Sequence, residues 1–154
     1  MTQQPVSDTV GPVKIEVLSD VTDEVTAAFA RLLPQLSRSA APLSKAALAG
    51  IAGHEATTVL VARDATGIVG TLTLVMYPIP TGLRAHIDDV VVDSSARGQG
   101  VGEELTLAAL RIATEAGART VDLTSRPSRE AANRLYQRLG FELRDSGVYR
   151  YSSK

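Results

Sequence analysis

The stretch Arg97-Gly98-Gln99-Gly100-Val101-Gly102 lies between two patterned segments and decides the fold of this chain. The residues before it, Asp88-Asp89-Val90-Val91-Val92-Asp93, are typical of a strand, and Val101 to Ala116 repeats apolar residues at helical spacing. The three alternating glycines let backbone N–H groups face outward with no Cβ in the way. The helix adds its unpaired N–H donors and the positive end of its dipole, so the stretch predicts a pyrophosphate site.

The glycine spacing restricts the phosphate ligand. A P-loop ends in Gly-Lys-Ser/Thr, whereas this loop ends in Gly100-Val101-Gly102-Glu103, which argues against a nucleoside triphosphate. A dinucleotide fingerprint needs a glycine where Glu103 stands. The pattern that is left is Arg-x-x-Gly-x-Gly.

This pattern resembles the acetyl-coenzyme A signature, Gln/Arg-x-x-Gly-x-Gly/Ala, of the GNAT family of N-acetyltransferases. The segment Ser128 to Phe141 resembles the last helix of that family, with its tyrosine at Tyr136 and its closing Gly140-Phe141. The close resemblance runs from Arg84 to Leu143. It implies the GNAT acyl-CoA N-acyltransferase fold, an α+β, three-layer sandwich of mixed α/β type with a central, mostly antiparallel sheet flanked by helices.

Residue periodicity predicts the order of elements without the resemblance. Strands are expected at residues 13–18, 57–63, 68–76, 85–92 and 120–124, and helices at 22–37, 44–51, 100–116 and from a cap at Ser128. Two prolines remove ladder donors from residues 77–82, which are therefore expected to form a loop. Residues 141–144 and 148–151 are expected to form a last hairpin.

The composition is that of one ordinary globular domain. Of the 154 residues, 44% are hydrophobic and 21% are charged, which suits a single domain over residues 13–154 preceded by a disordered tail at 1–12. The net charge of -1 gives no positive electrostatic field that would attract nucleic acid or an anionic membrane. The absence of cysteine excludes a thiolate nucleophile, and His54 and His86 show no metal-ligand spacing, so no metal is expected. Neither a signal peptide nor a membrane span is recognisable, so we expect a cytoplasmic protein.

The resemblance implies acetyl-CoA as the acetyl donor and CoA as a product. Backbone groups of Val90, Val91 and Val92 would pair with the acyl-pantetheine arm as an added strand. The main-chain N–H groups of the loop would hold the pyrophosphate; these belong to Gly98, Gln99, Gly100, Val101, Gly102 and Glu103. Arg97 opens the motif, and its side chain either adds charge to the phosphates or is a solvated surface group.

Tyr136 matches the tyrosine that acts in this family as general acid towards the departing thiolate. The alternative is a helix tyrosine that packs at the edge of the core. Many family members place a cofactor-binding asparagine seven residues before this tyrosine, where this chain has Arg129. Asn133, one turn before Tyr136, is therefore the candidate for the pantetheine arm, and Arg129 for the phosphates.

The general base is the least defined part of the predicted site. Some GNAT enzymes use a glutamate on the strand before the last helix, but residues 120–124 contain none. The segment from His86 to Val92 resembles the same strand of glucosamine-phosphate acetyltransferases, whose acidic pair lies beside the amine, so Asp88 and Asp89 are the candidates. Adjacent strand residues point to opposite faces, so only one of them is expected to meet the ligand. His86 reads by itself as a structural or surface residue.

These features predict an N-acetyltransferase that moves acetyl from acetyl-CoA directly to a primary amine. A small amine such as an amino sugar, a polyamine or an amino acid is the first choice of acceptor. A protein N-terminus or a lysine is the second choice. A non-catalytic acyl-CoA-binding module would keep the glycine loop and have no need of Tyr136 or the acidic pair. Homodimer formation is left open.

Overall fold

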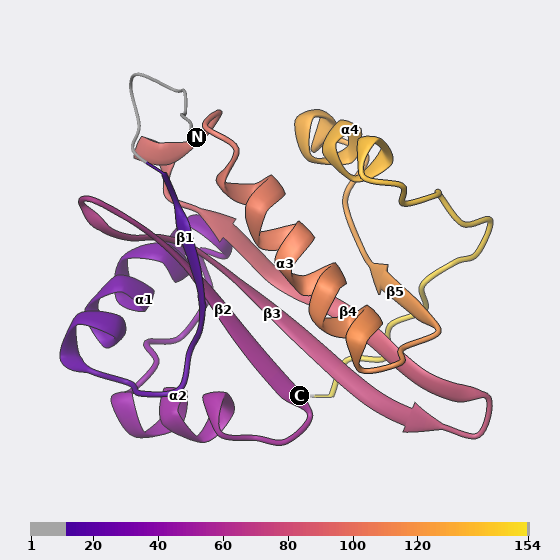
Figure 1. Ribbon diagram of the computed structural model, residues 1–154, viewed down its shortest axis with the longest axis horizontal. Coiled ribbons are helices and arrows are strands. Elements are labelled where there is room, and N and C mark those ends of the chain that lie inside the picture. The colour runs from indigo at the N-terminus through magenta and orange to yellow at the C-terminus, as the bar shows by residue number, and fades with distance from the viewer. Residues whose placement is uncertain (1–11, 154) are drawn as a thin grey trace, which may run out of the picture. The chain divides into compact units, whose positions relative to one another are not determined.

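The computed structural model describes residues 12–153, so the tail predicted at Met1 to Pro12 lies outside the described residues except for Pro12 (Figure 1). The chain divides between Thr124 and Ser125 into two compact units. We call residues 12–124 the sheet unit and residues 125–153 the C-terminal unit, and describe each by itself. None of the helices within residues 12–153 has the length and apolar character needed to cross a bilayer.

The sheet unit is built on one five-stranded sheet with the strand order β1-β2-β3-β4-β5. Its strands are β1 (Lys14–Val17), β2 (Thr57–Asp64), β3 (Gly67–Ile79), β4 (Gly82–Val92) and β5 (Thr120–Leu123). The first four pair antiparallel, and β4 pairs parallel with β5 through Arg84 to Ile87. The predicted mixed, mostly antiparallel sheet is therefore confirmed.

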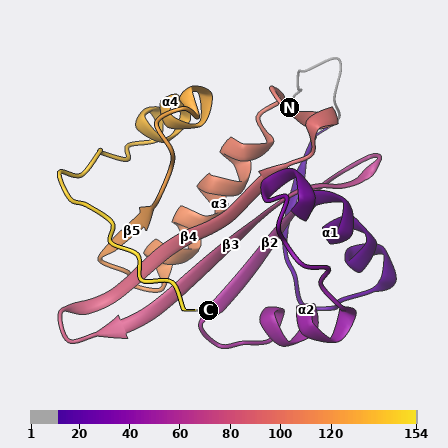
Figure 2. The ribbon, with the colours of Figure 1, turned by 180° about the vertical axis from the view of Figure 1, so that it is seen from behind.

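Helices α1 (Asp23–Leu36) and α2 (Lys45–Ala52) cover one face of this sheet (Figure 2). Thr22 and Ser44 cap them by accepting hydrogen bonds from Val25 N and Ala47 N. The apolar sides of these helices pack against β-branched residues of the sheet. The core that they form comprises Val25, Ala28, Phe29, Leu32 and Leu48 with Val59, Val61 and Val91. Burial of these side chains, worth about 1.5–3 kcal/mol for each large one, holds the layer in place.

Helix α3 (Val101–Glu115) covers the opposite face and completes the predicted three layers. It approaches β3 closely, because a Cβ placed on Gly70 would lie 3.1 Å from Val101 Cγ1 and 3.2 Å from Leu105 Cδ1. Val101, Leu105 and Ala109 are buried. The apolar spacing that predicted this helix therefore forms its packed side.

The C-terminal unit contains one helix, α4 (Glu130–Arg138). The predicted last hairpin is wrong, since residues 141–153 contain no strand. Leu143, Val148, Tyr149 and Tyr151 are exposed, each by at least 73%. An isolated two-stranded hairpin is only marginally stable in water. Alternation of apolar and polar residues in one segment does not supply the packing against a second layer that such a hairpin needs.

Two local predictions also fail. Residues 77–82 do not form a loop, because β3 and β4 extend towards each other as far as the pair Ile79 and Gly82. Strand β2 begins at Thr57, opposite Val75, so no residue of β2 pairs with Pro78 and β3 has a neighbour on one side only at that point. The donor that proline lacks is not needed on the open side. Ser128 does not cap α4, whose first flanking position is Arg129 with no side-chain cap.

Candidate active site

The glycine loop has the conformation of an anion-binding turn. Gly98 and Gly100 adopt φ angles of 79° and 83°, in the left-handed region that favours glycine. A Cβ at either position would meet nothing within 4 Å, so the loop is open to the outside. Gly100 is the flanking residue of α3, and no side chain caps the N–H groups that follow it. Outward donors at a helix start suit the phosphates of a bound ligand.

A polar network ties the start of this loop to α1. Arg31 Nε lies 3.0 Å from Asp93 Oδ2, and Arg31 Nη2 donates to the carbonyl of Ile68. Asp93 Oδ1 accepts a hydrogen bond from Ser95 N, and Gln35 Oε1 accepts one from Ser94 N. Helix α1 thereby holds the residues that directly follow β4 and lead into the glycine loop.

These contacts lower the pKa of Asp93, first through the hydrogen bond from the Ser95 N–H and then through the Arg31 guanidinium. A carboxylate with a lowered pKa in the folded state stabilises the fold above its unfolded pKa, about 3.9, and loses that contribution as the pH falls through the folded value. We therefore expect Asp93→Asn to cost most stability near pH 7. The cost should shrink as the pH falls below about 4.

Urea unfolding of both proteins from pH 7 down to pH 3 measures this difference. Asparagine keeps an acceptor oxygen for Ser95 N, and it removes the charge and the second acceptor, which faces Arg31. A stability difference that does not change with pH would contradict the contribution of the carboxylate charge.

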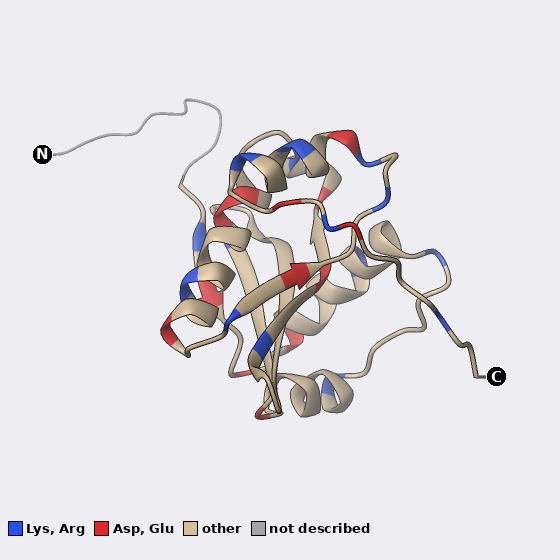
Figure 3. Cartoon of the chain, turned by 90° about the vertical axis from the view of Figure 1, so that its right-hand side faces the viewer, with Lys and Arg blue, Asp and Glu red and all other residues tan. Residues whose placement is uncertain are grey.

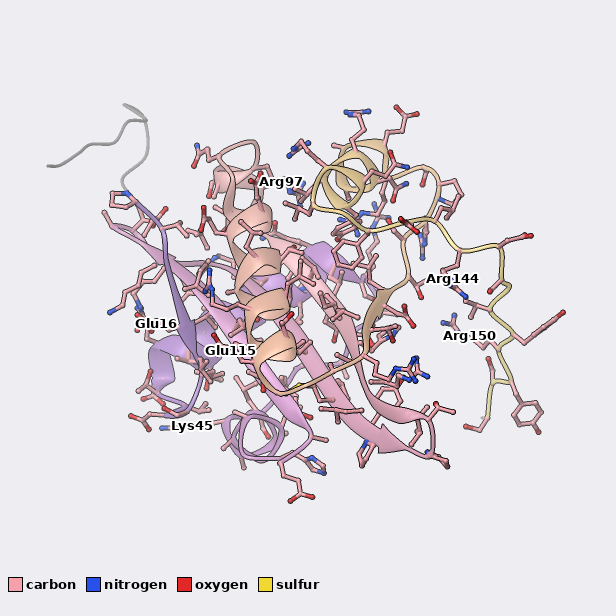
Figure 4. All side chains as sticks on the ribbon, turned by 45° about the vertical axis from the view of Figure 1, so that its right-hand side comes forward. Glu16, Lys45, Arg97, Glu115, Arg144 and Arg150 are labelled. Atoms are coloured by element: carbon pink, nitrogen blue, oxygen red, sulfur yellow. The ribbon has the colours of Figure 1, made fainter. Side chains whose placement is uncertain are left out.

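Arg97 turns back towards the end of β4. Its Nε donates to the carbonyl of Val92 at 3.1 Å, and its place at the start of the loop is visible in Figure 4. One donor of the guanidinium is thus used inside the protein. Its role towards phosphates stays a prediction.

The edge of β4 that faces β5 is unpaired near its end. Pairing with β5 stops at Ile87 and Leu123, whereas β4 continues for five residues to Val92, and no other strand of the described chain joins that edge. The side chain of Val91 is buried in the core, and Val90 and Val92 are half-buried. The side chains therefore serve the core, while backbone groups on that edge of Val90 and Val91 can pair with an extended ligand.

A bulge interrupts β4 just before these valines. Thr73 pairs with Asp88 and Thr71 with Val91, so Asp89 and Val90 together stand opposite one residue of β3. Asp89 has a φ of 50°, the one non-glycine residue in the described range 12–153 with a positive value. Aspartate tolerates this region better than most residues, but the conformation is strained. The bulge separates the two aspartates, and the register places Asp88 on the face of Thr73.

The carboxyl group of Asp89 is perturbed by its surroundings. Partial removal of its carboxyl from water raises the pKa of Asp89, and the charge of Asp88 raises it further. A raised pKa makes a carboxylate a better proton acceptor near neutral pH.

The tertiary structure brings His86, Asp88 and Asp122 together on one face of the sheet. His86 Nε2 lies 3.7 Å from Asp88 Oδ2, and the parallel pairing sets His86 beside Asp122 on β5. Figure 3, which views the molecule from the side of β5, shows the acidic segments of β4 and β5 next to each other in red. Asp122 is not among the site residues predicted from the sequence, and it is found only from the β4–β5 register.

In the C-terminal unit, Tyr136 lies on α4 and is buried, with 7% of its surface exposed. Its ring meets Phe141 edge-on at a centroid distance of 5.7 Å. Burial raises the pKa of Tyr136, and the charge of Arg129 partly opposes this shift. The hydroxyl therefore keeps its proton at neutral pH and can act as an acid.

Asn133 has a structural partner in the same unit. Its Nδ2 donates to the carbonyl of Arg126 at 3.0 Å, and its N–H donates to the carbonyl of Arg129. The side chain thus closes the turn that leads into α4, in place of the cap predicted at Ser128. Contact of Asn133 with a cofactor stays a prediction, and its side-chain oxygen is the atom left for that contact.

Comparison with known proteins shows the family of this chain. The model of the Acetyltransferase (GNAT) family matches residues 22–141. The glucosamine 6-phosphate N-acetyltransferase of Trypanosoma brucei brucei is 39% identical over 110 residues, which cover 66% of this chain and 73% of that protein. The N-alpha-acetyltransferase 30 of Schizosaccharomyces pombe is 38% identical over 71 residues, 46% of this chain and 47% of that protein, so the match spans about half of that relative.

A solved structure extends the comparison to the fold. The crystal structure of an acetyltransferase from Trypanosoma brucei superposes with a TM-score of 0.75 at 30% identity, covering 92% of this chain and all of that chain (100%).

Proposed function

The chain belongs to the GNAT family of acetyltransferases, and on that premise we propose that it transfers an acetyl group from acetyl-CoA to the primary amine of a small molecule. One observation carries the proposal. The open glycine loop with Gly98 and Gly100 in the left-handed region follows directly on a strand whose edge is unpaired. A phosphate-rich head joined to an extended arm with amide groups fits that combination, and CoA has this form.

Each part of the site has a task in the proposed reaction. Acetyl-CoA supplies an acyl carbon activated as a thioester. The N–H groups from Gly98 to Glu103 hold the pyrophosphate, and the edge of β4 at Val90 and Val91 pairs with the pantetheine amides. Tyr136, whose raised pKa keeps its hydroxyl protonated at neutral pH, donates its proton to the departing sulfur.

The acceptor is proposed to be a small, positively charged amine. Two carboxylates, Asp88 and Asp89, lie at the point where β4 loses its partner, and an ammonium group is attracted to them. The glucosamine 6-phosphate N-acetyltransferase among the relatives acts, by its name, on an amino sugar. We therefore place amino sugars first among the acceptors, before polyamines and amino acids.

A peptide N-terminus is the second candidate acceptor. The relative from Schizosaccharomyces pombe is named for acetylation of α-amino groups, and its match covers 46% of this chain.

A panel of amines assayed by release of the free CoA thiol tests the proposal. Glucosamine 6-phosphate, glucosamine, spermidine, free amino acids and short peptides are offered with acetyl-CoA, and mass spectrometry identifies the acetylated product. We expect turnover with at least one small amine. Turnover with peptides alone would favour the second candidate, and neither turnover nor stabilisation by acetyl-CoA would overturn the proposal.

We expect Asp89→Asn to raise the KM for the amine acceptor and to leave the KM for acetyl-CoA unchanged. The substitution keeps the shape and the tolerance of a positive φ, and it removes the charge that attracts the ammonium. Asp20→Asn, at an exposed position before α1, is the matched control. An unchanged KM for the acceptor in Asp89→Asn would remove this residue from the acceptor site.

A further inference from the structure

A polar face of the sheet near β5 holds an imidazole between carboxylates. Arg84, His86 and Asp88 alternate along β4 and share this face with Thr120 and Asp122 of β5, and Arg84 Nη1 donates to Thr120 Oγ1 at 3.2 Å. The His86 side chain is 31% exposed and that of Asp88 is 64% exposed, so solvent and small molecules can reach both.

The position of this group along β4 gives it a chemical context. His86 belongs to the last rungs of the β4–β5 ladder, and Asp88 is the first residue of β4 beyond it. The unpaired edge assigned above to the acyl arm begins at Asp88. An amine that attacks an acyl group held on that edge would therefore come close to the imidazole.

We propose that His86 is the catalytic base that removes a proton from the acceptor ammonium, and that Asp88 is a positioning residue that orients its ring. The proposal rests on the proposed acetyl transfer and names the proton acceptor of that site. Its geometric support is the 3.7 Å approach of His86 Nε2 to Asp88 Oδ2, together with Asp122 beside His86 on β5.

General acid–base chemistry favours an imidazole for this task. In model peptides a lysine ammonium has a pKa of about 10.4, an imidazole about 6.5 and an aspartate about 3.9, so the imidazole is the better matched acceptor of the two. A neighbouring carboxylate holds the ring in one orientation and compensates the charge of the imidazolium after proton transfer.

The proton and electron balance is complete without a further reagent. His86 takes one proton from the acceptor ammonium and later releases it to water. The neutral nitrogen uses its lone pair to form the C–N bond with the acyl carbon, and the C–S bond breaks with its electron pair going to sulfur. The sulfur receives its proton from Tyr136, and the second proton lost by the nitrogen restores the tyrosine hydroxyl. One amine, one acetyl group and one thiol are accounted for.

The groups that face His86 are Asp88 and Arg84 on its own strand and Asp122 on β5, while its partner on β3 is the uncharged Val75. A pH profile of the reaction therefore reports on all of these charged groups together. For this reason Asp88→Asn is measured alongside His86→Gln.

The test compares two acceptors in His86→Gln. We expect kcat/KM for an alkylamine, which is protonated at pH 7, to fall about 10²-fold or more. For an acceptor already neutral at pH 7, such as an aniline, we expect little change, because no proton has to be removed before attack. Added imidazole should restore part of the activity of His86→Ala with the alkylamine.

Asp88→Asn should move the low-pH limb of the alkylamine profile and lower kcat less than His86→Gln does. His54→Gln is the matched control, since the chain has two histidines and the imidazole of His54 accepts only the nearby Ala56 N–H. His54→Gln also assigns the two imidazole signals in an NMR titration. In that titration, Asp88→Asn should shift only the signal of His86.

The outcomes separate this inference from the proposed function. Equal losses with both kinds of acceptor, or unchanged activity in His86→Gln, would overturn the base assignment while the wild type still acetylates amines. A wild-type protein that acetylates no amine would instead overturn the proposed function.

Discussion

Gly100→Val is expected to abolish the rise in melting temperature that acetyl-CoA gives the wild type. A ligand that binds only the folded state at 100 times its Kd stabilises it by about 2.7 kcal/mol, and the variant should lose this gain. Gly100 has a φ of 83° and is the flanking residue of α3. A valine there is strained by about 1–2 kcal/mol or more and places a branched side chain over the N–H groups that would hold the pyrophosphate.

Gly117→Val is the matched control for this variant. Gly117 lies beyond the opposite end of α3 with a φ of 90°, and a Cβ there would also meet nothing within 4 Å. Both variants should lower the melting temperature of the unliganded protein, and only Gly100→Val should lose the response to acetyl-CoA. A folded Gly100→Val with unchanged affinity, or an equal loss in Gly117→Val, would place the phosphate site elsewhere.

Tyr136→Phe is expected to lower turnover by about 10²-fold or more while leaving the affinity for acetyl-CoA nearly unchanged. The substitution removes one hydroxyl and keeps the ring, so the edge-on contact with Phe141 is retained and the fold should persist. The raised pKa of Tyr136 leaves the hydroxyl protonated throughout the neutral range, so the proton is present to be donated.

Single-turnover measurements make this test decisive, because slow product release would otherwise hide a change in the chemical step. Tyr149→Phe, at a side chain that is 99% exposed, is the control. Unaltered single-turnover rates in Tyr136→Phe would return Tyr136 to the role of a packing residue.

Local pattern predicted most of the elements of this protein. The six residues from Arg97 to Gly102 predicted the loop and the start of α3. They could do so because positive φ values and helix starts are decided by residues that are adjacent in the sequence. The boundaries of α1, α2, β2 and β5 were predicted to within one residue for the same reason.

Errors arose where pairing decides the conformation. Pro78 predicted a loop, but β3 has only one neighbour at that point and continues as a strand. The segment 141–151 alternates as a strand does, yet the described residues give it no partner strand and its large apolar side chains are exposed. A strand is stabilised by hydrogen bonds to another strand, and no residue pattern within one segment supplies them.

The sequence by itself predicted an α+β member of the GNAT family with a glycine loop before its third helix, since both the periodicities and the family motif are local. Only the tertiary structure decided that β4 is bulged at Asp89, that its edge is unpaired beyond Ile87, and that Asp122 lies beside His86. The physical reason is that register is set by side chains packing across the whole sheet, and residues separated by 36 positions in the chain, such as Arg84 and Thr120, meet only after that packing is complete.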